Sequence, residues 1–361
     1  MKDKKLTDLD AQFGDVHNFG RQTHQIEIEG KPFFKKHRNL LWEELLVGES
    51  SSLLPLLSRT LGESAARGAM GLRFSKEKND HLGHVERFEG FLGIEEIPRD
   101  SLYYFNVGKQ IAYFMALGIT DILLENTKLH RGGIQLIDVE CVLSNTIAIE
   151  ESSLLPYPED DFDGQYGLFP LIYGVKEPAL FGHLALGLAD GLISIAQHHQ
   201  ELVQELETAL NSTATPPLVR VLMRATSEYD LFLRKDIMPQ VPFTPCEQEQ
   251  LDRGDVPYFF KHMGDHRIQY YKDAQYNTEF STVRPSRKGF SLSQTGFYPK
   301  QIVAPPRLNF LLKRSLRSLR YWTSIGSKYP FSFASKRTTI ELKEKRANIT
   351  FDDYYSENFA I

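Results

Sequence analysis

The segment that most constrains the fold is residues 117–141, in which two short apolar runs are flanked by polar residues. Its sequence is LGITDILLENTKLHRGGIQLIDVEC. The Gly-Gly pair can take the positive φ values that a tight turn requires, so residues 126–138 are predicted to form a β-hairpin. The hairpin would bring Asp138, at the end of the second strand, back to Asn126 at the start of the first.

Asp121, Asn126 and Asp138 have the separations of a kinase-type phosphotransfer centre. Phosphoryl transfer needs a carboxylate beside the attacking hydroxyl and oxygen ligands for magnesium ions. Asp121 is the candidate base, and Asn126 and Asp138 are the candidate metal ligands. Because a D-x4-N pattern also occurs by chance, the hypothesis needs support from elsewhere in the chain.

Support comes from a second cluster near the N-terminus, with the sequence FGDVHNFGRQTHQIEIEGKPFFKKHR. Alternating polarity over residues 25–28, followed by a Glu-Gly turn and an apolar strand, predicts a β-hairpin that ends in basic residues. The small lobe of a kinase places its phosphate-binding lysine at the end of such a strand. Lys36 and Lys35 are the candidates for this role.

Five motifs, in order along the chain, resemble the dehydratase domain of class II lanthipeptide synthetases. They are GDVHNFGR followed by K-x-R, then LGITDILLEN, LIDVEC, VRVLMRATSEYD and RGDVPYF, from about Phe13 to about Phe260. The resemblance implies an α+β, bilobal kinase-like fold with a small β-rich N-lobe and a larger, mostly helical C-lobe. It also implies ATP- and magnesium-dependent phosphorylation of Ser and Thr in a precursor peptide. Elimination of the phosphate would then leave dehydroalanine or dehydrobutyrine.

The resemblance assigns the phosphorylation step to residues from both clusters. Lys36 would hold the ATP phosphates, with Arg38 of the K-x-R motif beside it and Lys35 as the neighbouring candidate. The aspartate of LGITDILLEN would activate the peptide hydroxyl. The asparagine of the same motif and the aspartate of LIDVEC would bind magnesium.

The resemblance also implies an elimination site. Family members use the Asp and His of the GD-x-H motif, here Asp15 and His17, and an Arg and a Thr six residues apart, here Arg220 and Thr226. Elimination needs a base that removes the α-proton and groups that hold the departing phosphate. Because all four residues are present, the two-step reaction is predicted in preference to phosphorylation alone.

The chain departs from the family pattern in two motifs and in its extent. The family's D-x-H-x-E-N has Leu123 in place of the histidine, and its K-P-R is K-H-R here. The helical region that normally precedes GD-x-H and the zinc cyclase that normally follows are expected to be missing. The two cysteines, Cys141 and Cys246, lie far apart without a C-x-x-C pattern, so a separate cyclase is expected to close any rings.

Two alternative functions are compatible with the same residues. One is a peptide or protein Ser/Thr kinase that stops at the phosphoester. The other is a catalytically inactive scaffold that binds a precursor peptide for another enzyme. Both keep the fold but lack the elimination step.

Four further carboxylates are second choices for the site. Glu43 and Glu44, in the helix predicted over residues 40–47, could pair with the phosphate-binding lysine but are expected to lie on a solvated face. Glu125 and Glu140 flank the central motifs and could orient metal ligands.

The predicted organisation has three parts. Residues 1–100 form the N-lobe with the phosphate-binding lysine, and residues 101–306 form the C-lobe with the catalytic, metal and elimination residues. A helix predicted over residues 103–117 leads into the central segment. Residues 307–361 form a basic C-terminal extension that begins with an amphipathic helix, residues 307–328, which either packs on the protein or binds an acidic peptide.

Charge and hydropathy exclude several classes of protein. A net charge of −5 and a pI near 6.1 give no nucleic-acid-binding footprint. The start MKDKKLTDLD lacks the apolar core of a secretory signal, and no segment reaches about 18 uninterrupted apolar residues. A cytoplasmic enzyme without a transmembrane segment is therefore predicted, with ATP and Mg as cofactors and a precursor peptide with a leader segment as partner.

Overall fold

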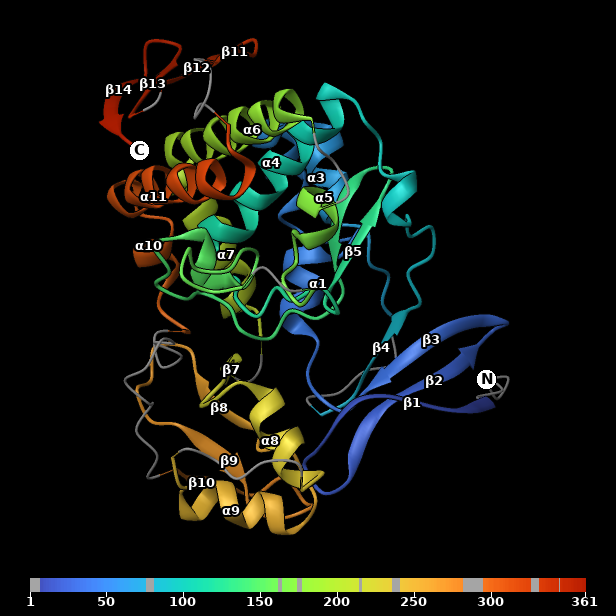
Figure 1. The fold of residues 1–361 in the computed structure, drawn as a ribbon. Coiled ribbons are helices and arrows are strands. Elements are labelled where there is room, and N and C mark those ends of the chain that lie inside the picture. Colours follow the sequence, from blue (N-terminus) through green and yellow to red (C-terminus); the bar gives the residue numbers. More distant parts are fainter. Residues whose placement is uncertain are drawn as a thin grey trace.

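The computed structural model has an α+β architecture in which a helical body lies above two smaller units that contain β-sheets (Figure 1). Within the described residues there are three four-stranded sheets and one two-stranded sheet. The α+β class is therefore confirmed. The structure describes residues 7–75, 81–161, 164–173, 177–213, 216–235, 241–281, 295–325, 331–343 and 345–361.

The N-terminal sheet contains the predicted basic-ended hairpin. Its strands follow the order β1-β2-β3-β4. The turn between β2 and β3 has φ values of 53° at Glu29 and 79° at Gly30, the left-handed conformation of a two-residue hairpin. Lys36 is the last residue of β3, directly before the link to α1 (Leu41–Val47). The strands are β1 (Thr7–His17), β2 (Arg21–Ile28), β3 (Lys31–Lys36) and β4 (Gly83–Glu86).

Two long helices, α4 (Ser101–Ala116) and α6 (Pro178–Gln197), form the centre of the helical body. They pack closely because glycines lie at their contact. A Cβ atom on Gly108 of α4 would lie 2.2 Å from the Leu184 carbonyl oxygen, and one on Gly187 of α6 would lie 2.0 Å from the Phe105 carbonyl oxygen. Helix α4 confirms the helix predicted over residues 103–117 and leads into the central segment.

The other elements of the body surround this pair. Helices α1, α2 and α3, which fall within residues 1–100, share one hydrophobic core with α4 and α6. The core of the body therefore draws on both sides of residue 100. The surrounding elements are α2 (Leu54–Leu61), α3 (Glu63–Ala69), η1 (Ile94–Glu96), β5 (Thr127–His130), β6 (Gly133–Leu136), η2 (Ile149–Ser152), α5 (Phe169–Tyr173), α7 (His199–Asn211) and α10 (Pro299–Ile302).

Helix α6 is the one helix of the described ranges that is long and apolar enough to cross a membrane. However, 89% of its apolar window is buried inside the protein, and it packs against α4 and α11 (Pro305–Thr323). Core helices have the same composition. This burial is consistent with the predicted lack of a transmembrane segment.

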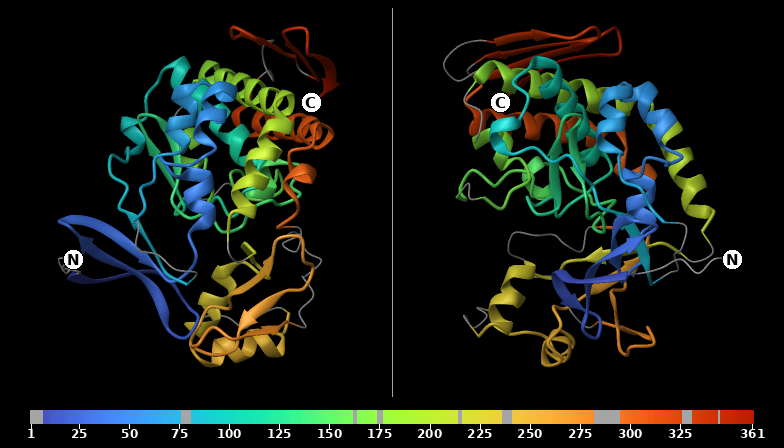
Figure 2. Two further views of the ribbon diagram at one scale, coloured as in Figure 1. Left: turned by 180° about the vertical axis from the view of Figure 1, so that it is seen from behind. Right: turned by 90° about the vertical axis from the view of Figure 1, so that its right-hand side faces the viewer.

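A third unit, residues 218–281, lies below the helical body and beside the N-terminal sheet (Figures 1 and 2). Its sheet has the strand order β10-β9-β8-β7. The chain enters the unit on β7, which carries the predicted elimination arginine, and then forms α8. The elements are β7 (Leu218–Val221), α8 (Thr226–Leu233), α9 (Pro245–Asp252), β8 (Phe259–His262), β9 (Gln269–Tyr271) and β10 (Thr278–Phe280).

The C-terminal region contributes a helix to the core of the helical body. The predicted basic helix is present as α11, and its leucines are buried in the main core. Arg307 is also buried, and its guanidinium donates to the backbone carbonyls of Met115, Ala116, Ser144 and Ile302. The sheet that follows was not predicted from the sequence, and it packs on α6. Its strands are β11 (Phe331–Ala334), β12 (Thr338–Lys343), β13 (Arg346–Phe351) and β14 (Tyr355–Ala360).

Candidate active site

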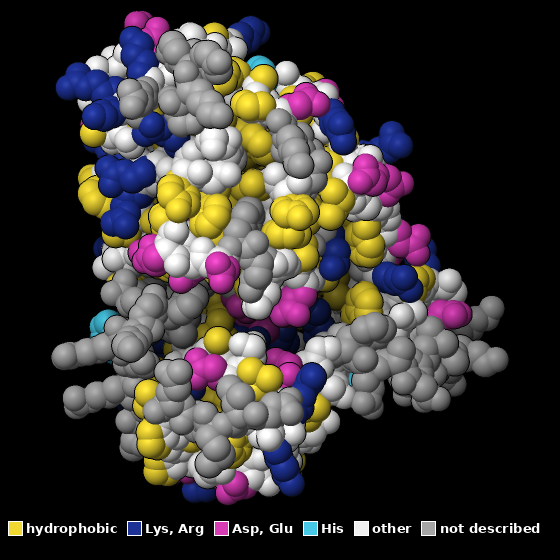
Figure 3. Space-filling model, in the orientation of Figure 1, with side chains coloured by type: hydrophobic (Ala, Val, Ile, Leu, Met, Phe, Trp, Pro, Cys, Tyr) yellow, Lys and Arg dark blue, Asp and Glu magenta, His cyan; other side chains and the backbone are white. Residues whose placement is uncertain are grey.

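One hollow, here called the front cavity, lies where the N-terminal sheet, the central segment and the third unit meet. It has a volume of about 560 Å³. Figure 3 shows acidic and basic side chains facing each other in the hollow between the body and the lower units. Nine of the ten predicted site residues line the front cavity: Asp15, His17, Lys36, Arg38, Asp121, Asn126, Asp138, Arg220 and Thr226.

Lys35 is the tenth predicted residue, and it is not part of this lining. Successive side chains of a strand point to opposite faces of the sheet. Since Lys36 lines the cavity, its neighbour Lys35 faces the other side of β3, where it pairs with His84 of β4. Of the two lysines, Lys36 is therefore the one placed to contact a ligand.

The central hairpin brings the two candidate metal ligands together. Strands β5 and β6 pair from Thr127 with Leu136 to His130 with Gly133. Just beyond the pairing, the Ile137 amide donates to the Asn126 carbonyl oxygen over 3.0 Å. Asn126 also donates from its side-chain Nδ2 to the Asp121 carbonyl oxygen over 3.0 Å. This bond fixes the Asn126 amide, and its Oδ1 atom is the end that could bind a cation.

Asp121 combines an unusual backbone conformation with an unusual pKa. Its φ is 63°, in the left-handed region that few residues other than Gly, Asn and Asp adopt. Burial raises the pKa of the Asp121 carboxyl to about 7; nearby Asp138 and Glu140 add to this rise and Arg220 opposes it. A carboxylate with a pKa near neutral pH suits general base catalysis.

Lys36 lies among acceptors at the end of β3. Its Nζ donates to the Ile137 carbonyl oxygen over 2.8 Å and lies 3.4 Å from Asp138 Oδ1 and 3.6 Å from Glu43 Oε1. Glu43 is only 1% exposed. The expectation that Glu43 lies on a solvated helix face is therefore wrong, because α1 turns this side chain toward the lysine. Glu44 does not line the front cavity.

Arg38 bridges several carboxylates of the site. Its Nη2 is bonded to Asp138 and to Glu43, and its Nε lies 3.3 Å from Glu140 Oε1. Burial opposes ionisation of Asp138, but the charges of Arg38, Lys36 and Arg220 outweigh it and lower the Asp138 pKa to about 2. Asp138 is therefore an anion at every physiological pH.

The turn between β1 and β2 is held by the third unit. The backbone amides of Phe19 and Gly20 each donate to the Asp255 carboxylate over 2.9 Å, and Arg253 lies 3.2 Å from Asp255 and over the Phe19 ring. Asp255 is fully buried. The contact fixes the GD-x-H motif against the RGDVPYF motif.

His17 lies beside this contact with one ring nitrogen engaged. Its Nδ1 is 2.6 Å from the Val256 carbonyl oxygen, so Nδ1 carries the proton and donates. Burial, followed by the charge of Arg220, lowers the pKa of His17. A neutral ring protonated at Nδ1 leaves Nε2 as a proton acceptor. Asp15, two residues earlier on β1, lines the same cavity.

Arg220 on β7 is anchored by two residues that link the halves of the site. Its Nη1 donates to Glu140 Oε1 over 3.0 Å, and Tyr258 donates from its hydroxyl to Glu140 Oε2 over 2.6 Å. The Arg220 guanidinium also lies over the Tyr258 ring, and His17 meets the same ring edge-on. Since Arg38 lies near the same carboxylate, Glu140 connects the two predicted half-sites.

Thr226 is the first residue of α8. The first amides of a helix have no acceptor within the helix, and the helix dipole favours an anion there. The Thr226 hydroxyl, which lines the same cavity as Arg220, can donate to a phosphate oxygen.

Asp255 and Tyr258 were not predicted from the sequence, and Glu43 and Glu140 were second choices. Asp255 and Tyr258 both lie within RGDVPYF, a motif that carried the resemblance but was given no residue roles. The presence of that motif in the sequence was therefore the feature from which Asp255 and Tyr258 could have been predicted. Leu123, which replaces the family histidine, does not line the front cavity, and its backbone pairs with Tyr166.

Substitution of Tyr258 by Phe should distinguish the contribution of the hydroxyl from that of the ring. The ring contacts with His17 and Arg220 would remain, while Glu140 would lose one donor and hold Arg220 less firmly. If the chain eliminates phosphate from a phosphopeptide, as the resemblance implies, we expect that step to slow about tenfold, as for one lost hydrogen bond to a charged group, with kcat falling and KM unchanged. Tyr355→Phe, which removes a hydroxyl bonded to Glu357 in the C-terminal sheet, is the control. Equal losses in both variants would contradict the assigned role.

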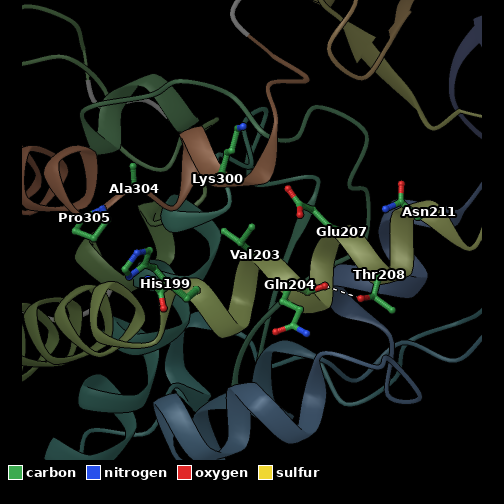
Figure 4. Close-up of a pocket in the computed structure, with 10 residues that line it drawn as sticks. His199, Val203, Gln204, Glu207, Thr208, Asn211, Lys300, Ala304 and Pro305 are labelled. Atoms are coloured by element: carbon green, nitrogen blue, oxygen red, sulfur yellow. Dashed lines mark hydrogen bonds between the residues drawn. The ribbon is translucent and has the colours of Figure 1, made fainter.

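A separate groove lies on α7, away from these residues. It is formed by one face of the helix, by Lys300 of α10 and by the start of α11, and His199 and Glu207 are among its other polar side chains (Figure 4). None of its lining residues is a predicted site residue. The groove therefore adds nothing to the candidate chemistry.

Comparisons with known proteins do not identify the chain. No protein-family model matches it, and no curated protein matches it either. The geometry of the front cavity is therefore the basis for any statement about function.

Proposed function

We propose that the chain dehydrates Ser and Thr residues of a ribosomally made precursor peptide, by ATP-dependent phosphorylation followed by elimination of phosphate. The observation that carries this proposal is the convergence of both predicted residue sets on the front cavity. A plain kinase would need only the first set. The finer description as a bilobal kinase-like fold belongs to the same proposal.

The arrangement around Lys36 supports the phosphorylation half. In protein kinases a lysine on the third strand pairs with a glutamate of the following helix and holds nucleotide phosphates. Here Lys36 ends β3, and Glu43 of α1 lies 3.6 Å from it. Asp121 would accept the hydroxyl proton of the peptide as that oxygen attacks the terminal phosphate of ATP.

The donor set fits a magnesium ion. Asp138 is ionised and Asn126 offers a neutral amide oxygen, which are the hard oxygen ligands that magnesium prefers. Within the described ranges, no group of three or more His, Cys, Asp or Glu could hold a metal alone. Kinase-type sites do not need three such protein ligands, because phosphate oxygens and water complete the coordination of the magnesium ion. When bound, the ion would neutralise charge on the phosphates, and it would compete with Arg38 for Asp138.

The second half of the site supports elimination. His17 Nε2, with Asp15 nearby, would take the α-proton of the phosphorylated residue. The electron pair of that C–H bond would form the new C=C bond as the Cβ–O bond breaks. Arg220, Thr226 and the start of α8 would hold the departing phosphate.

A phosphorylation-only enzyme is the second candidate, and Leu123 in place of the family histidine favours it. In either case we infer a cytoplasmic enzyme that acts on a peptide with a leader segment. Cys141 and Cys246 lie far apart without a C-x-x-C pattern, so ring closure would belong to a separate cyclase.

The proposal is tested by mass spectrometry of Ser- and Thr-containing peptides, including those encoded beside this gene, after incubation with ATP and magnesium. Loss of water from a peptide supports dehydration. A gain of phosphate without later loss of water would identify a kinase that stops at the phosphoester. Peptide binding without any nucleotide turnover would identify a scaffold.

A further inference from the structure

A second hollow, here called the back chamber, shares a wall with the front cavity. It has a volume of about 490 Å³. Helix α1, the strand β7 and the strand β8 contribute to its walls. The residues that line both hollows are Asn18, His37, Arg38, Glu140, Arg220 and Tyr258. The cluster that anchors Arg220 therefore stands between the two.

The two hollows differ in charge. The front cavity is lined by six carboxylates, those of Asp15, Glu86, Asp121, Glu125, Asp138 and Glu140, and by six Lys and Arg side chains. Among the described residues of the back chamber, Glu140 is the one carboxylate, and Arg38 and Arg220 outnumber it. These three side chains line both hollows, so a small oxyanion that moves from the front cavity to the back chamber leaves an even balance of charge for a positive one.

Histidine rings also line the back chamber, those of His37, His81 and His262. His262 Nδ1 lies 3.2 Å from the Pro216 carbonyl oxygen. Burial, followed by the charges of Lys35 and Arg21, lowers the pKa of His37 to about 4, so this ring is neutral and carries one N–H that can donate to an anion.

Arg220 provides the strongest indication of an anionic ligand. The residue is only 9% exposed, and its Nη2 is buried without a hydrogen-bond partner among the described residues. A buried donor without an acceptor costs free energy that a bound acceptor would recover. The lining of the chamber also includes half-buried His262 and exposed Pro216, so its described wall extends from buried Arg220 to residues at the surface.

We propose that the back chamber is a binding site for inorganic phosphate, which it receives at Arg220 and releases past His262 while nucleotide and peptide still fill the front cavity. This role rests on the proposed dehydration, in which each elimination forms one phosphate ion. The phosphate leaves with the electron pair of the broken Cβ–O bond, and the α-proton remains on the base.

The test is calorimetric titration of inorganic phosphate into the full chain, without peptide, in the absence and presence of ADP and magnesium. We expect binding under both conditions. His262→Glu and His81→Glu, on separate segments of the wall, should each weaken it about tenfold, since each places a negative charge beside the anion. His199→Glu, the same change in the α7 groove (Figure 4), should leave it unchanged.

Displacement of phosphate by ADP, or unchanged binding in both chamber variants, would overturn the proposal. Because the titration contains no peptide, its result is separable from the proposed function. If the chain binds phosphate as described but dehydrates no peptide, the phosphate site stands and the proposed dehydration is wrong. If the chain dehydrates peptide but binds no phosphate, the proposed dehydration stands and the phosphate site is wrong.

Discussion

Replacement of Asp121 by Asn is expected to abolish peptide phosphorylation while making the folded chain more stable at neutral pH. Asn cannot accept the hydroxyl proton, so kcat/KM should fall by about 10²–10⁴, the usual contribution of a general base. Asn also adopts the left-handed backbone that this position requires, with φ of 63°. The loss of activity should therefore occur without a change in the fold, and mass spectrometry of the peptide measures it.

The stability gain follows from the raised pKa of Asp121. Between the ordinary value of 3.8 and about 7, the unfolded chain has lost this proton and the folded chain keeps it. The unfolded state binds fewer protons in this window, so the free energy of unfolding of the parent protein falls as pH rises. The Asn variant lacks this titration.

The advantage of the Asn variant should therefore grow from pH 4 to pH 7 and then level off. The pKa difference corresponds to at most about 4 kcal/mol, and partial access of water reduces this to about 1–2 kcal/mol. Thermal unfolding at a series of pH values measures the gain. Asp353→Asn, on an exposed turn, controls for the loss of charge alone. A gain that does not depend on pH would exclude the assigned titration.

The elements that could be predicted from the sequence are those specified by neighbouring residues. The turn at Glu29 and Gly30 requires two left-handed residues, and the sequence supplies a Glu-Gly pair between alternating strands. The β5–β6 hairpin is specified in the same way, although only Gly133 of its Gly-Gly pair has a positive φ. The positions of Lys36 at the end of β3, and of Asn126 and Asp138 beside the β5–β6 hairpin, could therefore be predicted.

Contacts between distant segments could not be predicted, because no local pattern encodes them. The Asp255 carboxylate binds backbone amides more than 230 residues away in the chain. Glu43 has an acidic neighbour at Glu44, and only the packing of α1 decides which of them is buried. The C-terminal sheet alternates in burial, but its partner surface on α6 is set by the tertiary fold.

Replacement of Thr226 by Val should stop the reaction halfway, so that phosphopeptide accumulates. Val keeps the shape of the side chain but cannot donate a hydrogen bond to the departing phosphate. Removing one donor that stabilises developing charge typically costs about 10²–10³ in kcat. Phosphorylation should be unchanged, because Thr226 lies on α8 and the phosphorylation residues lie on β3 and the central segment. Asp15→Asn should produce the same accumulation.

Ser227→Ala is the matched control for this experiment. Ser227 follows Thr226 on α8, is exposed and does not line the front cavity, so losing its hydroxyl tests the helix terminus without touching the site. We expect full dehydration in this variant and accumulated phosphopeptide in Thr226→Val, with synthetic phosphopeptide as a direct substrate for the second step. Full dehydration by Thr226→Val would remove Thr226 from the elimination site. Loss of both steps would instead mean that α8 supports the cavity as a whole, and the separation of the reaction into two residue sets would fail.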